Sequence, residues 1–140
     1  MYKGMTIVAA AFLLSYAVAD AHENHEHVKH HTDVQMAKLH KMMPRYAKAQ
    51  ALIQASLEKG DVKGVVKQAD YILSTTADLK KSTPHKNVEK LNEFQGLAGD
   101  LEHDIRGLAD AAKKGDLEGA RAAFASAARQ CNSCHAKFRS

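Results

Sequence analysis

Two cysteines and a histidine near the end of the chain form the pentapeptide Cys131-Asn132-Ser133-Cys134-His135. The spacing C-x-x-C-H is typical of sites where a c-type haem is attached covalently. Each thiol can add to a haem vinyl group as a thioether, and the adjoining imidazole can bind the iron. On a helix, residues three and four apart share one face, so a single porphyrin could contact all three side chains. The sequence therefore predicts one covalent haem c on Cys131 and Cys134, with His135 as the proximal iron ligand.

Other uses of a C-x-x-C pair fit the rest of the chain less well. A dithiol redox pair is expected beside a βαβ pattern, and a zinc site needs further thiols or a second histidine at suitable spacing. The chain has two cysteines, both inside this motif, and neither pattern follows. The sequence also contains no hydrolytic or nucleophilic constellation. We therefore expect a haem protein that transfers electrons or binds a gas, and not an enzyme.

The first 19 residues have the pattern of a secretory signal peptide. Lys3 gives a short basic region, and an apolar stretch over residues 5–19 follows. Small residues precede two candidate cleavage points, after Ala19 and after Ala21. The apolar run is shorter than the ~20 residues that span a bilayer, which argues against a membrane anchor. Because c-type haem is attached after export, we expect a soluble periplasmic protein with no membrane attachment after cleavage.

Residues 20–31 would then form the start of the mature chain, and this leader is rich in histidine. Five of the nine histidines fall here: His22, His25, His27, His30 and His31. Imidazoles at such density can bind copper, nickel or zinc, so a metal-handling role is one hypothesis. The segment is polar and has no fixed geometry, so we favour a disordered leader without a specific ligand.

Residues 32–140 repeat apolar side chains at intervals of three and four. The stripes cover residues 36–57, 62–79, 91–112 and 117–138. Gln50 and Thr76 are polar exceptions within them. Such stripes predict four amphipathic helices that bury their apolar faces against one another. The expected fold class is all-α, with one domain that binds one covalent haem.

Turn residues separate the stripes. Gly60-Asp61 and Gly115-Asp116 lie in two near copies of one motif, in which the glycine ends a helix and the aspartate caps the next. Residues 82–87 form a breaker cluster between the two pairs. This order predicts an antiparallel up-down-up-down four-helix bundle. Pro44 lies inside the first stripe, so we expect a kink or a break over residues 40–44.

A second iron ligand should come from the first helix. In this topology the start of the first helix faces the end of the fourth, which brings Met36, Leu39, His40 and Met43 to the level of the haem. We take Met36 as the distal ligand, because a thioether opposite an imidazole is an established haem pair. An ordinary core methionine is the alternative, and His40 is a rival ligand.

The last helix resembles that of the cytochrome c′ family. The likeness rests on its G-D-L start at residues 115–117, its R-A-A-F stretch at residues 121–124 and its C-x-x-C-H-x-x-F-R end at residues 131–139. Low-spin relatives carry a methionine ligand early in helix 1 in an M-x-x-[LIM] setting, which residues 36–39 match. The resemblance also implies that Arg139 could contact a haem propionate. The arginine that many relatives have four residues before the haem-facing position is replaced by Thr32.

These observations leave three hypotheses of different classes. The first is a periplasmic single-electron carrier with His135 and Met36 as axial ligands, which would serve periplasmic redox proteins. The second is a high-spin cytochrome c′ that binds nitric oxide or carbon monoxide at an open distal side. The third is a metal-handling protein that uses its histidine-rich leader.

Family members are often dimers, which permits a homodimer. Removal of residues 1–19 lowers the net charge from +4 to +3, and this mixed surface argues against nucleic-acid binding.

Overall fold

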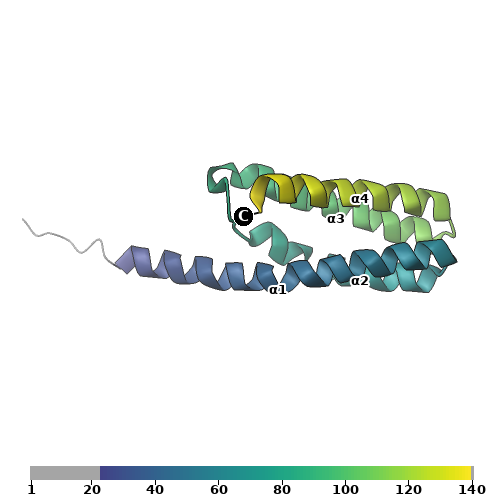
Figure 1. Cartoon of the computed structure of the whole chain (residues 1–140), viewed down its shortest axis with the longest axis horizontal. Coiled ribbons are helices and arrows are strands. Elements are labelled where there is room, and N and C mark those ends of the chain that lie inside the picture. The colour runs from purple at the N-terminus through teal and green to yellow at the C-terminus, as the bar shows by residue number, and fades with distance from the viewer. Residues whose placement is uncertain (1–22, 140) are drawn as a thin grey trace, which may run out of the picture.

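Four α-helices run alternately up and down and form an antiparallel bundle (Figure 1). The computed structural model describes the backbone of residues 23–139 and the side chains of residues 34–139. The predicted signal peptide lies outside the described residues. The helices are α1 (Glu23–Lys59), α2 (Val62–Lys81), α3 (Leu91–Lys113) and α4 (Leu117–Phe138), and a short 3-10 helix η1 (Val88–Lys90) precedes α3. The predicted fold class is confirmed.

The two tight turns are built alike, as their sequences predicted. Gly60 and Gly115 have φ values of 68° and 77°, in the left-handed region that glycine adopts without strain. The next residue caps the following helix in each case. Asp61 accepts a hydrogen bond from the Gly64 amide at 3.0 Å, and Asp116 accepts one from the Gly119 amide at 2.8 Å. Each cap satisfies an amide that the first turn of a helix leaves unpaired.

The connection between the two hairpins is fastened to the end of α4. The side chain of Asn87 donates a hydrogen bond to the Lys137 carbonyl at 2.6 Å, and the Lys86 amide donates to the Phe138 carbonyl at 3.4 Å. The last carbonyls of a helix have no partner within the helix, so this loop supplies donors for two of them. The loop thus fixes the last turn of α4, which carries His135.

The apolar stripes meet in one core. Its largest fully buried apolar side chains in the helices are Ile53, Val65, Ile72, Ile105 and Leu108, which come from the first three helices. Thr76, one of the two polar exceptions, is also buried, and its hydroxyl donates to the Leu73 carbonyl at 3.0 Å. That bond satisfies the polar group inside the core.

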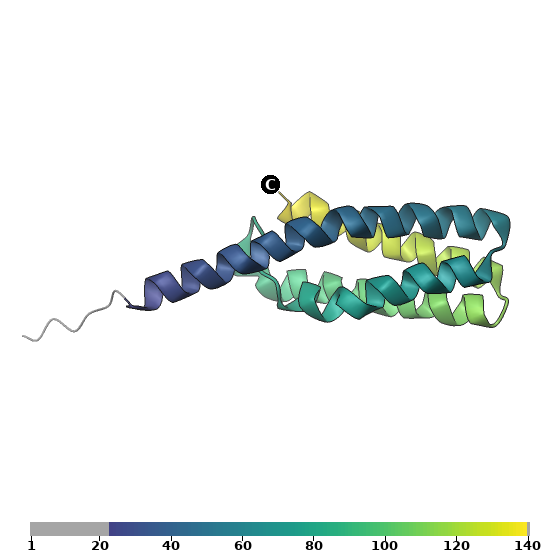
Figure 2. The same cartoon turned by 90° about the horizontal axis from the view of Figure 1, so that it is seen from below.

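We predicted a kink or a break at Pro44; helix α1 is continuous through this residue, so there is no break, and the helix bends instead. Figure 2 shows α1 changing direction where it passes the end of α4, and its N-terminal part extends beyond the bundle.

The backbone of residues 23–31 belongs to this helix, whereas we expected a disordered leader from the composition. A helix closes its hydrogen bonds locally, so it can extend from a packed segment without burying apolar surface. Metal binding by the leader stays a prediction, which a copper titration would test.

The helices are not packed equally closely. Helix α4 packs mainly against α3, and α1 packs mainly against α2, whereas α1 and α4 make the fewest contacts of the neighbouring helices. The bundle therefore consists of two hairpins that are close at α2 and α3 and more open between α1 and α4. The cavity described next lies at the more open side.

Candidate functional site

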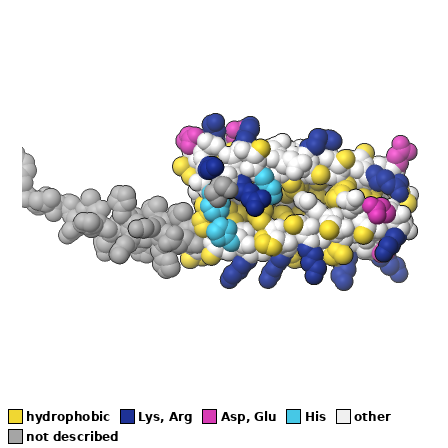
Figure 3. Space-filling model, viewed as in Figure 1, with side chains coloured by type: hydrophobic (Ala, Val, Ile, Leu, Met, Phe, Trp, Pro, Cys, Tyr) yellow, Lys and Arg dark blue, Asp and Glu magenta, His cyan; other side chains and the backbone are white. Residues whose placement is uncertain are grey.

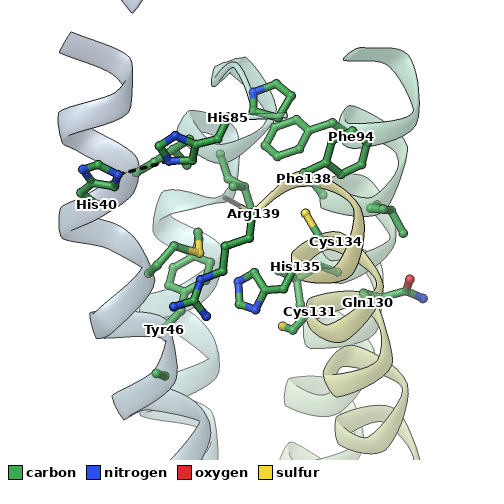
Figure 4. A pocket seen from close by; sticks show the side chains of 18 of the residues that line it. His40, Tyr46, His85, Phe94, Gln130, Cys131, Cys134, His135, Phe138 and Arg139 are labelled. Atoms are coloured by element: carbon green, nitrogen blue, oxygen red, sulfur yellow. Dashed lines mark hydrogen bonds between the residues drawn. The ribbon is translucent and has the colours of Figure 1, made fainter. Parts of the chain in front are cut away.

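A cavity of about 580 Å³ lies near the end of the bundle where α4 stops (Figure 4). Side chains from all four helices and from the loop after α2 line it, and most of them are apolar. Those used below are Leu39, His40, Met43, Tyr46, Gln50, His85, Cys131, Cys134, His135 and Arg139. At the end of the cavity where α4 stops, the Phe94 and Phe138 rings pack edge to face, with their centroids 5.4 Å apart. The cavity suits a largely apolar group with a polar edge at the surface.

The structure brings the three residues of the C-x-x-C-H motif into this cavity. Cys131 and Cys134 are half-buried, whereas His135 is exposed at the mouth. Figure 4 shows all three in the last turns of α4, on the side of the helix that lines the cavity. Their positions i, i+3 and i+4 explain this common face, as the sequence predicted. One planar group in the cavity can therefore meet both sulfurs and the imidazole.

The surroundings keep these groups uncharged. Burial raises the pKa of the Cys134 thiol to about 11, and it also raises the pKa of the Cys131 thiol. His135 is exposed as a whole residue, but the partial desolvation of its ring at the cavity mouth and, to a lesser extent, the Arg139 guanidinium lower the pKa of its imidazole. A neutral imidazole has a free lone pair on one ring nitrogen, as a metal ligand requires. Figure 4 shows Arg139 beside His135, and its predicted contact with a propionate stays a prediction.

Opposite the motif, α1 contributes a methionine that is not the predicted one. Met43 lines the cavity together with Leu39 and His40, whereas Met36 does not line it. Met36 is partly buried and packs against the core. The two methionines are seven residues apart, two turns and about 10 Å along the helix. Of the two thioethers, that of Met43 is therefore the one in the same cavity as Cys131, Cys134 and His135.

Gln50 is the polar exception in the first stripe, and its side chain contacts the C-x-x-C-H motif. Its side-chain amide donates a hydrogen bond to the Cys131 sulfur, with 2.9 Å between Nε2 and Sγ. The two residues are 81 positions apart in the chain. A leucine at position 50 would continue the apolar stripe but could not donate to the sulfur. The break in the stripe was the signal for this contact, although periodicity alone does not say what the polar group meets.

Tyr46 anchors the cavity wall to α2. Its hydroxyl lies 2.8 Å from the Thr75 hydroxyl and donates to the Ile72 carbonyl at 3.3 Å. The side chain is 4% exposed. Burial raises the pKa of the Tyr46 hydroxyl to about 12. The phenol therefore stays neutral and holds α1 against α2 at the level of the cavity.

Replacement of Tyr46 by phenylalanine should remove one contribution to the loss of unfolding free energy at alkaline pH. The folded-state pKa of about 12 lies above the value of about 10 expected in the unfolded chain, so the contribution of the neutral phenol is complete below pH 10 and is lost as the pH rises through 12. The difference in unfolding free energy between wild type and Tyr46→Phe should shrink by about 2 kcal/mol across that window. Urea titrations at several alkaline pH values would measure it. A difference that does not vary with pH would contradict the assignment.

Two histidines far apart in the sequence meet at the cavity mouth. The Nε2 atoms of His40 and His85 are 3.1 Å apart, and the ring centroids are 5.0 Å apart (Figure 4). The sequence made His40 a rival iron ligand. In the structure His40 contacts His85, and the pair joins α1 to the loop after α2. Among the described side chains, no group of three or more histidine, cysteine or acidic residues could hold a metal ion.

The comparisons with known proteins identify the family to which these features belong. The family model described as Cytochrome C′ matches residues 20–139. The search of curated proteins and the search of solved structures gave no match. Within the described part of the chain, no helix is both long and apolar enough to cross a membrane.

Proposed function

The chain belongs to the cytochrome c′ family, whose members bind covalently attached haem c, and from that premise we propose that it is a single-electron carrier of the periplasm. The family carries haem or binds gases and is not generally enzymatic. When bound, haem supplies one-electron chemistry at its iron. The observation that carries the proposal is the cavity in which both thiols and His135 on α4 lie across from a methionine on α1.

The residues of the cavity fit a covalent haem. Cys131 and Cys134 would form the thioethers, and the neutral imidazole of His135 would bind the iron. The cavity is otherwise lined mostly by apolar side chains, which exclude water from the porphyrin faces and raise the reduction potential. Arg139 at the mouth could pair with a propionate. This assignment uses the predicted residues and adds Gln50, whose amide lies beside the Cys131 sulfur.

A methionine from α1 would complete the iron coordination. The sequence favoured Met36, because its surroundings match low-spin relatives. The lining of the cavity favours Met43 instead, and we therefore propose His135 and Met43 as the axial pair. A thioether opposite an imidazole raises the reduction potential, which suits an electron carrier. A closed iron also prevents a gas from binding.

The visible spectrum of the holoprotein tests the proposal. The oxidised form should show the weak band near the red edge that accompanies methionine bound to ferric iron. Carbon monoxide should barely change the Soret band of the reduced form, because the sixth position is occupied. An immediate large shift would instead support the second candidate, a cytochrome that binds nitric oxide or carbon monoxide. That candidate requires that the Met43 thioether, although it lines the cavity, does not bind the iron.

A further inference from the structure

Charge is distributed unequally between the two helices that flank the open side of the cavity and the two behind them. Residues 34–59 of α1 contain five cations and one acidic residue, and residues 117–139, which are α4 and its C-cap, contain four cations and one acidic residue. By contrast, residues 62–113, which include α2 and α3, contain eight acidic and eight basic residues. The face formed by α1 and α4 is therefore strongly positive, and the rest of the bundle is balanced.

Much of this positive charge is exposed and unpaired. Within the described chain, Lys38 pairs with Asp78 at 2.9 Å and Lys137 pairs with Glu93. The salt bridges among the described residues include none with Lys41, Arg45 or Lys48, and all three side chains are exposed. They follow one another at intervals of four and three along α1, so they form a row on the helix surface. Unpaired like charges in a row produce a positive potential that extends into solvent.

The row borders the mouth of the cavity. Pro44 and Ala47 are exposed and line the cavity, and Lys41 and Lys48 lie three residues before and four residues after Pro44, on the same side of α1. On the opposite rim, Arg139 lines the cavity at the end of α4. Figure 3 shows lysine and arginine side chains along the edge formed by α1, and histidines around a hydrophobic hollow near the C-terminal end.

We propose that this face, defined by Lys41, Arg45, Lys48 and Arg139, is the docking surface for a redox protein with an acidic patch around its own cofactor. The inference rests on the proposed electron-carrier function and adds the chemistry of the partner. A positive rim attracts an acidic surface and orients it, so that the two redox groups approach across the cavity mouth. Two copies of this chain that met through this face would bring like charges together, which disfavours self-association at this surface. A membrane is disfavoured because the row carries no aromatic side chain for the lipid interface.

Oxidation by charged reagents measures the field at the cavity mouth. The reduced holoprotein would be mixed in stopped flow with ferricyanide, an anion, and with tris(phenanthroline)cobalt(III), a cation, over a range of ionic strength. The ferricyanide rate should fall as salt is added, and the cobalt rate should rise. The variant K41E/R45E/K48E should lower the ferricyanide rate at low salt by about tenfold or more and raise the cobalt rate. The protein should also exchange electrons on a carboxylate-terminated electrode and not on an amine-terminated one.

The variant K63E/K67E/K113E is the matched control. It makes the same change in net charge with three exposed lysines, two in the first turns of α2 and one in the last turn of α3, away from the cavity. Its rates should stay close to those of wild type. Equal effects of the two variants would overturn the proposal, because overall charge would then suffice. Binding to phosphatidylglycerol vesicles that only K41E/R45E/K48E abolishes, with unchanged oxidation rates, would assign the face to a membrane instead. A coloured, redox-active protein without charge dependence would refute the docking surface alone, whereas a colourless one would refute the proposed function.

Discussion

Replacement of Cys131 and Cys134 by serine should yield a protein from which acid acetone extracts all the haem. Serine cannot form a thioether, so any porphyrin in the cavity would be held only by His135 and by apolar contacts. The haem stain of the denatured protein should disappear completely. The wild-type protein should keep its haem through the same extraction. The measurement is the absorbance of the protein and solvent phases after extraction.

A control within the same motif separates chemistry from folding. Asn132 and Ser133 lie between the cysteines and are exposed, so the variant N132A/S133A should keep its covalent haem. Circular dichroism of each variant would report the helix content. Haem that stays attached when both cysteines are serine would contradict the site. So would a colourless wild-type protein in which both thiols react with a thiol reagent.

Replacement of Met43 by leucine should open the iron. Leucine has nearly the volume of methionine, so packing should cost less than about 1.5 kcal/mol, but it cannot bind the iron. The reduced variant should bind carbon monoxide at once, with a large Soret shift, and the weak red-edge band of the oxidised form should vanish. The reduction potential should fall, because the thioether ligand is lost. Wild type should show neither change.

Met36→Leu is the matched control for this experiment, since it makes the same change on the same helix two turns earlier. If Met43 is the ligand, Met36→Leu should keep the wild-type spectrum. An open iron in Met36→Leu and not in Met43→Leu would restore the ligand that the sequence favoured. A closed iron in both variants would shift the assignment to His40, and an open iron in wild type would favour the gas-binding candidate.

Most of the fold could be predicted from local sequence patterns. The stripes at three and four identify the helices, because each amphipathic face needs a partner. The glycine-aspartate turns identify the hairpins, because the left-handed residue and the cap have strong local requirements. The cluster on α4 was predictable for the same reason, since Cys131, Cys134 and His135 share one helix face whatever the tertiary structure.

Contacts between helices were less predictable. Met36 and Met43 continue the same stripe, so periodicity does not distinguish them. Which of them lies at the level of the cavity depends on the position of α1 along its axis relative to α4. The contacts of Gln50 with Cys131 and of His40 with His85 join residues 81 and 45 positions apart. Pro44 predicted a kink or a break, and the sequence could not decide between them, because packing against neighbouring helices determines whether a helix bends and continues.

The sparse contact between α1 and α4 gives the prosthetic group a mechanical role. The open side of the bundle between α1 and α4 runs beside the cavity that we propose as the haem site. A porphyrin bonded to α4 and ligated from α1 would cross-link the hairpins there. Loading the cofactor would then close the open side between α1 and α4, while α2 and α3 already hold the two hairpins together in the unloaded polypeptide.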